Sequence, residues 1–156
     1  MKVRLLKASE IDELFEMIKR SIEQVFPLYY PSQSITYVLE ELVNKSALEN
    51  RMNKGRFYVA EDRGKIVGCG CIAKHINNVD GDFCLLTFFV DPAIQGKGIG
   101  KAIVKACESD EMLKKAKRIE VPSSIPALPF YKRIGYEHRN GELNYEDGHF
   151  WLEKIL

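Results

Sequence analysis

The sequence lacks any surplus of charge of one sign. Lys and Arg number 23 and Asp and Glu number 22, which leaves a formal net charge of +1 in 156 residues. Proteins that bind nucleic acid broadly carry a basic surplus on one face. The balance therefore argues against a nucleic-acid partner, although it leaves room for a local basic pocket that holds one phosphorylated ligand.

Long apolar runs are also missing. No stretch approaches the uninterrupted apolar length of a membrane helix. Met1–Leu6 is followed by acidic, polar sequence rather than by the apolar core of a secretory signal. We therefore expect no membrane partner and a cytoplasmic location.

Cysteine is scarce and lacks the spacing of a metal site. The four cysteines are Cys69, Cys71, Cys84 and Cys107. The first two share one face of a predicted strand, but no second pair and no interleaved histidines follow, as a zinc site requires. We interpret all four as reduced, buried thiols and expect no metal.

The residues that are present match one ordinary folded domain. Apolar residues make up 46% and charged residues 29% of the chain, close to the average of soluble globular proteins. No repeat, linker or low-complexity segment divides the sequence. We therefore predict a single domain over residues 1–156, which is long enough to bury a core.

The spacing of apolar residues predicts an ordered series of strands and helices. Strand patterns cover Met1–Leu6, Phe57–Ala60, Ile66–Ile76, Phe83–Val90, Arg118–Val121, Tyr136–Leu143 and Gly148–Leu156. Helical patterns begin at Ser9 and Ser34 and cover Lys97–Ala116 and Pro126–Ile134. Hairpins come early and a strand–helix–strand unit comes late. This order predicts an α+β fold, a mixed sheet with helices packed on it, rather than a doubly wound sheet.

A glycine-rich turn between an apolar strand and an amphipathic helix is the most informative segment. It reads Gln95-Gly96-Lys97-Gly98-Ile99-Gly100-Lys101. Glycines let the backbone approach a ligand and adopt a positive φ. The first N–H groups of the following helix lack partners and carry the positive end of its dipole. Together these features predict an anion site, most often one for phosphate.

Two other families of phosphate-binding loop fit the segment less well. A P-loop requires Ser or Thr after Gly-Lys, whereas Ala102 follows Gly100-Lys101. A dinucleotide-binding loop reads Gly-x-Gly-x-x-Gly inside a βαβ unit, and this loop has alternating glycines after a hairpin-rich half. A nucleotide-binding enzyme that uses this loop is therefore a less favoured alternative for this chain.

The loop resembles the coenzyme A pyrophosphate signature of the GNAT acetyltransferases. The matching residues are Gln95, Gly98 and Gly100, and Val90-Asp91-Pro92 is similar to the strand exit of that family. A second motif, Pro126–Tyr136, resembles the family's helix with Phe-Tyr, a basic residue and Gly-Tyr. Both motifs occur in the family's order, and the order of strands and helices fits along nearly the whole chain.

The resemblance implies a fold and a set of coenzyme contacts. The fold would be a central, mixed, mostly antiparallel sheet of six to seven strands with helices on both faces. The backbone of the central strand would bind the pantetheine arm, and the loop would hold the pyrophosphate. The implied contacts are Phe88, Phe89, Val90, Gln95, Gly96, Lys97, Gly98, Ile99, Gly100, Lys101 and Ser124. Lys97 and Lys101 are equally well interpreted as solvated lysines at a helix start.

Two departures from the family pattern concern the second motif. Ser124 stands where the family often has an asparagine that contacts the coenzyme, and a serine still donates and accepts hydrogen bonds. Pro129 lies inside the predicted helix, where its ring is expected to kink the helix or remove a hydrogen bond. The kink would disturb the position of Tyr131.

The resemblance also implies a catalytic role for Tyr131. A phenol can give a proton to the departing thiolate; alternatively, this ring packs beneath the coenzyme. The general base is less clear, because Phe83–Val90 carries no carboxylate. We take His75 as the candidate base for its ordinary pKa range, although it equally fits a structural role. His138 and His149 rank lower.

The segment Phe26–Pro31 is the candidate acceptor site. Phe26, Tyr29 and Tyr30 either clamp the apolar body of a substrate or pack as core.

The predicted function is transfer of an acetyl group from acetyl-CoA to a primary amine of a small molecule or peptide, by direct attack in a ternary complex. The alternative is a catalytically weak, GNAT-like module that binds coenzyme A as a sensor or partner domain. A homodimer formed through the closing hairpin around Phe150–Leu152 is a further expectation.

Overall fold

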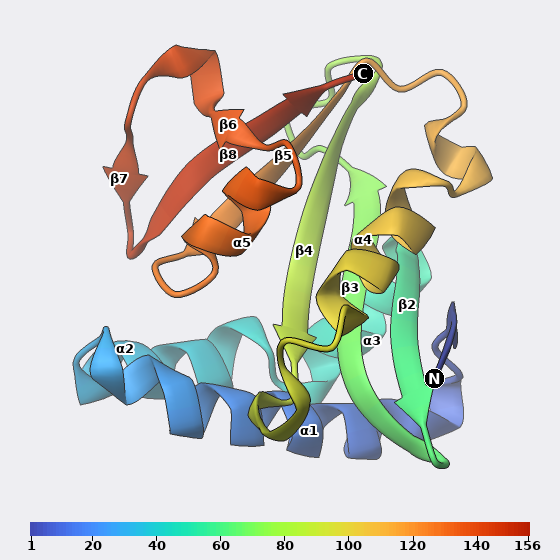
Figure 1. Cartoon of the computed structure of the whole chain (residues 1–156), viewed down its shortest axis with the longest axis vertical. Coiled ribbons are helices and arrows are strands. Elements are labelled where there is room, and N and C mark those ends of the chain that lie inside the picture. Colours follow the sequence, from blue (N-terminus) through green and yellow to red (C-terminus); the bar gives the residue numbers. More distant parts are fainter.

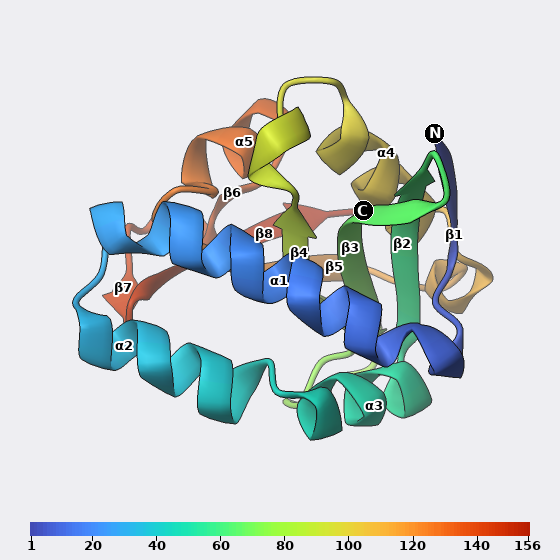
Figure 2. The same cartoon turned by 90° about the horizontal axis from the view of Figure 1, so that it is seen from below.

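The computed structural model describes residues 1–156 as one eight-stranded sheet with helices on both faces (Figures 1 and 2). The strands lie in the order β1-β2-β3-β4-β5-β8-β6, and β7 pairs with β8. Their bounds are β1 Lys2–Leu5, β2 Arg56–Asp62, β3 Lys65–Lys74, β4 Asp82–Val90, β5 Arg118–Ser124, β6 Glu137–His138, β7 Tyr145–Glu146 and β8 His149–Ile155. The helices are α1 Ile11–Val25, α2 Ser32–Tyr37, α3 Lys45–Lys54, α4 Ile99–Glu108 and α5 Leu128–Arg133.

The sheet is mixed and mostly antiparallel. Only β4 and β5 run parallel, and every other pair of neighbouring strands is antiparallel. The predicted α+β class and helix-flanked sheet are confirmed. The strand count is eight rather than six to seven, because the closing segment contributes two strands of two residues each, β6 and β7.

The two faces of the sheet carry separate cores, and the viewpoint of Figure 2 separates their helices. Helices α1 and α3 cover one face, where Leu14, Ile18 and Leu48 are fully buried. Helices α4 and α5 cover the other face, where Ile103 and Tyr136 are fully buried. Side chains that alternate along each strand therefore pack into two different cores, as in any sheet covered on both faces.

Strands β4 and β5 are paired over three residues only. Asp82, Phe83 and Cys84 face Arg118, Ile119 and Glu120, and no pair follows. Figure 1 shows the two strands side by side near the C-terminus of the chain and apart at their other ends. The rest of β4 therefore has a neighbour on the β3 side alone.

Ion pairs of largely buried carboxylates join β4, β5 and β8 at the end where β4 and β5 are paired. The Arg118 guanidinium lies 2.6 Å from carboxylate oxygens of both Asp82 and Glu120, and 3.1 Å from Glu153 on β8. Arg139 reaches the second oxygen of Glu120 at 3.2 Å. Since Glu120 is only 2% exposed, these cations are what make its burial tolerable.

Several helix boundaries differ from the prediction. Helix α3 forms from the polar segment 45–54, in which only Leu48 is buried, and the Asn44 side chain caps it by accepting from Ala47 N at 2.8 Å. A π-helical turn, Val38–Leu42, precedes it. Helix α4 ends at Glu108 rather than Ala116. No helix in the chain is long and apolar enough to cross a membrane.

The expected kink at Pro129 does not occur. Helix α5 begins at Leu128, so the proline occupies its first turn. In the first turn of a helix the missing N–H would have no partner in any case, and the fixed φ suits the helix. The helix after it keeps Tyr131 in place.

The closing strand β8 is paired on both sides. Residues 149–155 face β5, and the other edge of β8 faces β6 and β7. The residues Phe150–Leu152 therefore do not lie at a free edge, contrary to the reasoning from which a homodimer was expected.

The Arg118–Asp82 pair gives the fold a dependence on pH. The Arg118 guanidinium holds the pKa of Asp82 below its ordinary value of 3.8. A carboxyl whose pKa is depressed by folding stabilises the protein above its unfolded pKa, and this contribution is lost as pH falls through the folded pKa. We expect Asp82→Asn to lower the free energy of unfolding at pH 7 by about 1.5–3 kcal/mol, as for a hydrogen bond to a charged group.

Urea unfolding of the variant and the wild type at pH 7 and below pH 3.8 checks this. The difference in the free energy of unfolding between the variant and the wild type should be smaller below pH 3.8 than at pH 7. Asp80→Asn is the control, because Asp80 is exposed and makes no ion pair. An equal loss in both variants would contradict the assignment.

Candidate active site

A cavity of about 660 Å³ lies where β4 and β5 part. Its walls come from both faces of the sheet: Phe130 and Ile99 belong to the α4/α5 face, whereas Ser21 and Val25 belong to α1. The complete lining is Ser21, Val25, Phe88, Phe89, Val90, Gln95, Gly96, Gly98, Ile99, Gly100, Lys101, Ser124, Pro126, Ala127, Pro129, Phe130, Arg133 and Ile134. The cavity therefore passes through the sheet and can bring two molecules together from opposite faces.

The glycine loop forms one mouth of the cavity. Gly96 and Gly98 have φ values of 83° and 78°, in the left-handed region that favours glycine. Gly98 is the N-cap of α4, which has ten residues, so the free N–H groups and the positive end of the dipole face this mouth. The Gln95 side chain donates to the carbonyl oxygen of Val90 at 3.2 Å and ties the loop to the end of β4.

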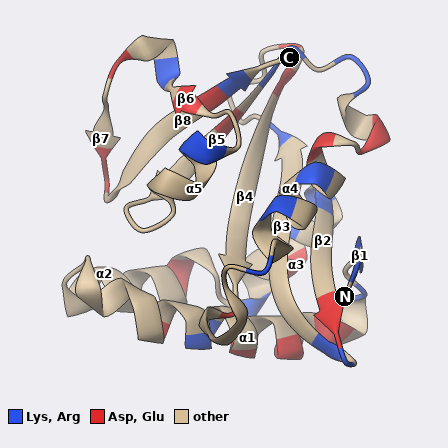
Figure 3. Cartoon of the chain, viewed as in Figure 1, with Lys and Arg blue, Asp and Glu red and all other residues tan.

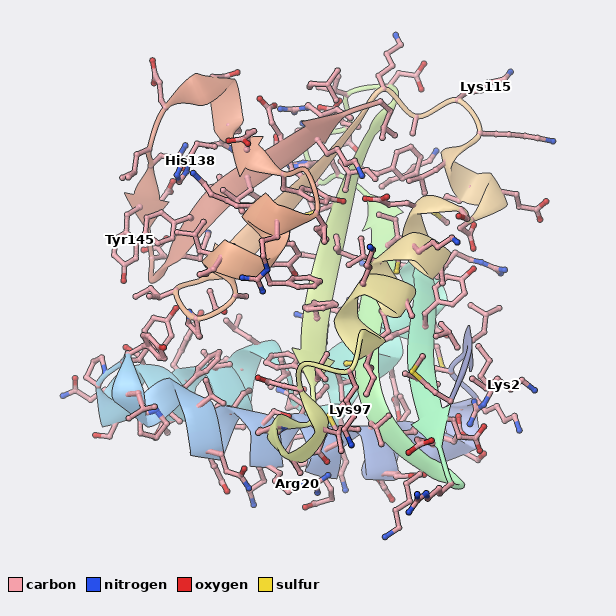
Figure 4. All side chains as sticks on the ribbon, viewed as in Figure 1. Lys2, Arg20, Lys97, Lys115, His138 and Tyr145 are labelled. Carbon is pink, nitrogen blue, oxygen red and sulfur yellow. The ribbon has the colours of Figure 1, made fainter.

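Asp91 anchors the other end of the loop. Its carboxylate accepts from the backbone N–H of Ala93 at 3.0 Å and from Arg20 on α1 at 2.8 Å. Figure 4 shows Arg20 and Lys97 in the same region of the molecule. The loop is thus fixed to β4 and to α1 at once.

Gly100 allows the aromatic floor of the cavity to lie against α4. A Cβ at this position would come within 3.0 Å of Phe88 Cζ and 3.2 Å of Phe130 Cε2. These two rings are stacked, with centroids 5.1 Å apart. The third glycine of the loop is therefore required by close packing rather than by a positive φ.

The charge at the loop mouth is positive. Lys101 and Arg133 line the cavity, and no Asp or Glu does so. Figure 3 shows Lys and Arg on the loop, α4 and α5. Glycine N–H groups, a helix N-terminus and these cations fit a phosphate-bearing ligand. No group of three or more His, Cys, Asp or Glu is arranged to hold a metal ion.

A β-bulge distorts β4 beside the cavity. The register with β3 shifts between Cys69, which faces Phe89, and Cys71, which faces Leu86. Within the bulge Thr87 has φ 53°, a left-handed conformation that is costly for a β-branched residue. The Cys69 thiol donates to the Thr87 carbonyl at 3.1 Å. The bulge re-aims the backbone of Phe88–Val90, which has no partner on the β5 side.

Tyr131 lies behind the cavity wall. It is 2% exposed, and its ring centroid is 5.5 Å from Phe88 and 5.3 Å from Phe130, both of which line the cavity. Burial raises the pKa of the Tyr131 phenol well above its ordinary value of 10.0, and neighbouring thiols add to the effect. The hydroxyl therefore stays protonated and can act only as a donor of its proton.

His75 is not brought to the cavity. It follows β3, whose Gly68 faces Val90 near the loop, so seven residues of strand, roughly 23 Å, separate it from that end. It lines a separate hollow of about 310 Å³ with Lys74 and Asp82. Its Nε2 lies 3.7 Å from Glu120.

The aromatic segment after α1 reaches the site in part. The Phe26 ring packs on Phe89, with centroids 6.4 Å apart. The Tyr30 hydroxyl donates to the carbonyl of Gly148 at 2.7 Å and accepts from the N–H of Ile125 at 2.8 Å. Tyr30 therefore joins the ends of β5 and β8, whereas Tyr29 is 46% exposed.

Sequence reasoning missed several residues that line or border the cavity, among them Ser21, Val25, Arg133 and Thr87. Ser21 and Val25 lie on α1, far from either motif. The only signal for them in the sequence is the helical spacing of the neighbouring apolar residues, which predicts the buried face of this helix. Arg133 belongs to the second motif but gave no signal beyond a basic residue. Thr87 carries the bulge, and no local pattern in the apolar run Phe83–Val90 marks it.

Comparison with known proteins supplies a family and a fold. The family model for the acetyltransferase (GNAT) domain matches residues 53–138, more than half of the chain. The spermine/spermidine N(1)-acetyltransferase of Bacillus subtilis (strain 168) is 38% identical over 73 residues, which cover 44% of this chain and 47% of that protein. An uncharacterized N-acetyltransferase of Methanocaldococcus jannaschii is 36% identical over 91 residues, covering 53% and 39%. The chain spans about half the length of the curated relatives it matches, or less.

Solved structures share the fold over the whole chain. The PaiA N-acetyltransferase of Thermoplasma acidophilum, crystallised with coenzyme A, superposes with a TM-score of 0.84 at 18% identity and covers 99% of this chain and 98% of that one. A GNAT family acetyltransferase of Brucella melitensis, crystallised with acetyl-CoA, gives a TM-score of 0.68 at 17% identity, with coverage of 99% and 86%.

The strained residue in the bulge can be tested by stability. We expect Thr87→Gly to leave the free energy of unfolding unchanged or to raise it by up to about 2.5 kcal/mol. Relief of left-handed strain gains about 1–3 kcal/mol, whereas glycine in a strand costs about 0.5–1 kcal/mol. Chemical denaturation provides the measurement.

Lys74→Gly is the matched control for this test. Lys74 lies exposed in β3 at an ordinary strand position. The free energy of unfolding of its glycine variant should therefore be lower than that of the wild type by about 0.5–1 kcal/mol. Equal losses in the two variants would show that Thr87 stores no strain.

Proposed function

The chain belongs to the GNAT acetyltransferase family, and on that premise we propose that it transfers an acetyl group from acetyl-CoA to a primary amine of a small molecule or peptide. The observation that carries the proposal is the cavity that crosses the sheet between β4 and β5, with a left-handed glycine loop at one mouth. A single opening of this kind lets an acyl donor and an amine meet from opposite faces.

The loop supplies the binding site for the donor. The N–H groups from Gly96 to Lys101 and the N-terminus of α4 would hold the pyrophosphate, and Lys101 and Arg133 would add charge. The unpartnered backbone of Phe88–Val90 would bind the pantetheine arm and polarise the thioester carbonyl. Preorganised donors of this type are usually the largest electrostatic contribution to acyl transfer.

Tyr131 is the proposed proton donor to the leaving thiolate. Burial raises the pKa of the phenol, so the hydroxyl carries a proton that it can give to the leaving group. The Tyr131 ring lies against Phe88 and Phe130, two residues that line the cavity. The straight start of α5 at Pro129 supports a fixed position for the ring.

A small amine is the proposed acceptor. Two curated relatives are named for spermine or spermidine, which supports this class. Phe26 and Phe89 would contact the apolar part of the acceptor on the α1 face. A homodimer and a cytoplasmic location stay predictions.

Binding of acetyl-CoA is tested first by titration calorimetry on the wild type and on Gly98→Glu. The substitution places a carboxylate where the pyrophosphate would lie, and juxtaposed like charges cost several kcal/mol. We expect micromolar binding by the wild type and an affinity at least about 100-fold weaker in the variant.

Gly64→Glu is the matched control. Gly64 and Gly98 have φ values of 77° and 78°, and neither has an atom within 4 Å of an added Cβ, so both variants carry similar backbone strain. Only Gly98 lines the cavity. Absence of binding by folded wild type would refute the proposed function and redirect the work to ATP and NAD.

The donor role of Tyr131 is tested with Tyr131→Phe. We expect kcat to fall about 100-fold, the lower range for general acid catalysis, while the Kd for acetyl-CoA stays within about threefold. Tyr136→Phe is the control, since Tyr136 is also fully buried but its hydroxyl donates to Glu108 at 2.9 Å. Unchanged kcat in Tyr131→Phe would assign the ring to packing alone.

A further inference from the structure

The three histidines of the chain share an unusual feature. Each has a buried ring nitrogen without a hydrogen-bond partner: His75 Nε2, His138 Nδ1 and His149 Nε2. An unsatisfied buried polar atom costs about 1–3 kcal/mol, so each of these nitrogens requires an explanation. Their positions in the sheet separate them.

Two of the histidines lie away from the cavity. His75 borders the hollow at the turn between β3 and β4. His138 faces Leu152 across the β6–β8 pair and packs on Phe150, with ring centroids 5.9 Å apart. Figure 4 shows His138 on the β6 side of the molecule, beyond β8. Neither residue borders the space where an amine would meet a thioester.

His149 does not line the cavity itself, but it lies one strand away from a residue that does. It faces Ser124 across the β5–β8 pair, and Ser124 lines the cavity. Residues directly opposite each other in an antiparallel pair project on one face, with Cβ atoms about 4.5–5.5 Å apart. Trp151, the next residue on that face of β8, packs edge-on against the imidazole at 5.2 Å.

This face of the sheet is the one opposite α4 and α5. Leu152, one residue after Trp151, belongs to the core under α4 and α5, so His149 and Trp151 project to the other side. The Tyr30 hydroxyl bonds the backbone of Gly148 and Ile125, the residues that adjoin His149 and Ser124. These two bonds fix the backbone next to the His149–Ser124 pair.

We propose that His149 is the general base that takes a proton from the acceptor amine through one water molecule held with Ser124. This inference rests on the proposed function. It replaces His75 with a residue that lies next to the predicted coenzyme contact Ser124.

The proton balance of the step is as follows. The acceptor enters as an ammonium ion and gives one proton through the water molecule to Nε2 of His149, and the freed lone pair forms the C–N bond to the acetyl carbon. When the C–S bond breaks, the sulfur leaves with the electron pair and takes a proton from Tyr131, and the second proton lost by the nitrogen restores the Tyr131 phenol. One proton is released in all, and the imidazolium returns it to water.

The charged groups around His149 are few. Glu146 faces it across the β7–β8 pair, and the Tyr30 phenol adjoins it through Gly148. The Trp151 ring that packs on the imidazole is also contacted by Arg139, 5.1 Å from its centroid, and by the His75 ring, with centroids 6.1 Å apart. Glu120 lies beyond Trp151 and is already paired with Arg118 and Arg139. Glu146 is thus the one carboxylate in register with the imidazole.

The experiment compares His149→Gln with His75→Gln and His138→Gln in tag-free protein. Rates of acetyl transfer to a small primary amine are measured from pH 5 to pH 9 at saturating acetyl-CoA, together with the Kd for coenzyme A. We expect His149→Gln to lower kcat about 100-fold or more, to lose the acidic limb of the pH profile of kcat/KM, and to keep the Kd. The two controls should stay within about threefold of the wild type.

Two further measurements distinguish a general base from a residue with a purely structural role: rescue of the rate by imidazole, and NMR of the histidine rings. Added imidazole should restore part of the rate of His149→Ala. The ring signals of three histidines are assigned by their loss in the three glutamine variants, and only the His149 signal should shift when coenzyme A is added to the wild type.

The outcomes separate the two proposals. A wild-type rate and pH profile in His149→Gln, or a His149 signal that ignores coenzyme A, would overturn the assignment of His149. A wild type that binds coenzyme A and shifts the His149 signal but acetylates no amine would support the place of His149 and refute the acetyltransferase function.

Discussion

The parting of β4 and β5 after three residue pairs is the constraint on which the rest of the site depends. Three features define it. At the closed end, Arg118 is bound to Asp82 and Glu120 and clamps the strands together. Beyond it, Pro122 has no N–H to offer a neighbouring strand, and the bulge at Thr87 turns the backbone of β4 away from a regular ladder. The opening is therefore specified on both strands.

A sheet that opens in its middle needs support on both faces, which explains why two cores exist. Ile99 and Ile103 pack α4 on one face, and α1 packs on the other through Leu14 and Ile18. The loop between β4 and α4 is tied to both layers, because Asp91 binds Arg20 on α1 while Gly100 lets Phe88 and Phe130 lie against α4. The cavity thus has walls that cannot close independently of each other.

The local parts of this arrangement were predictable from the sequence, because they depend on near neighbours in the chain. Alternating glycines before an apolar helical stripe predict the loop and α4, and the apolar run 83–90 predicts a central strand. Two features of the helices were not predicted in this way. No helix was predicted over the polar segment 45–54, which forms α3 with one buried leucine and the Asn44 cap. The kink expected at Pro129 was wrong, because α5 begins at Leu128 and the proline lies in its first turn.

The site shows the same division more sharply. Motif residues such as Gln95 and Gly98 meet at the cavity because they are close in sequence, but the histidines are set by register. His75 follows a strand next to the central one, yet β3 runs antiparallel to β4 and carries it to the far end of the sheet. His149 lies 25 positions after Ser124, and only the β5–β8 pairing brings the two side by side. A one-residue slip in that pairing would turn His149 to the other face, so the proposed role of His149 depends on strand register, whereas the candidate proton donor Tyr131 comes from the second motif.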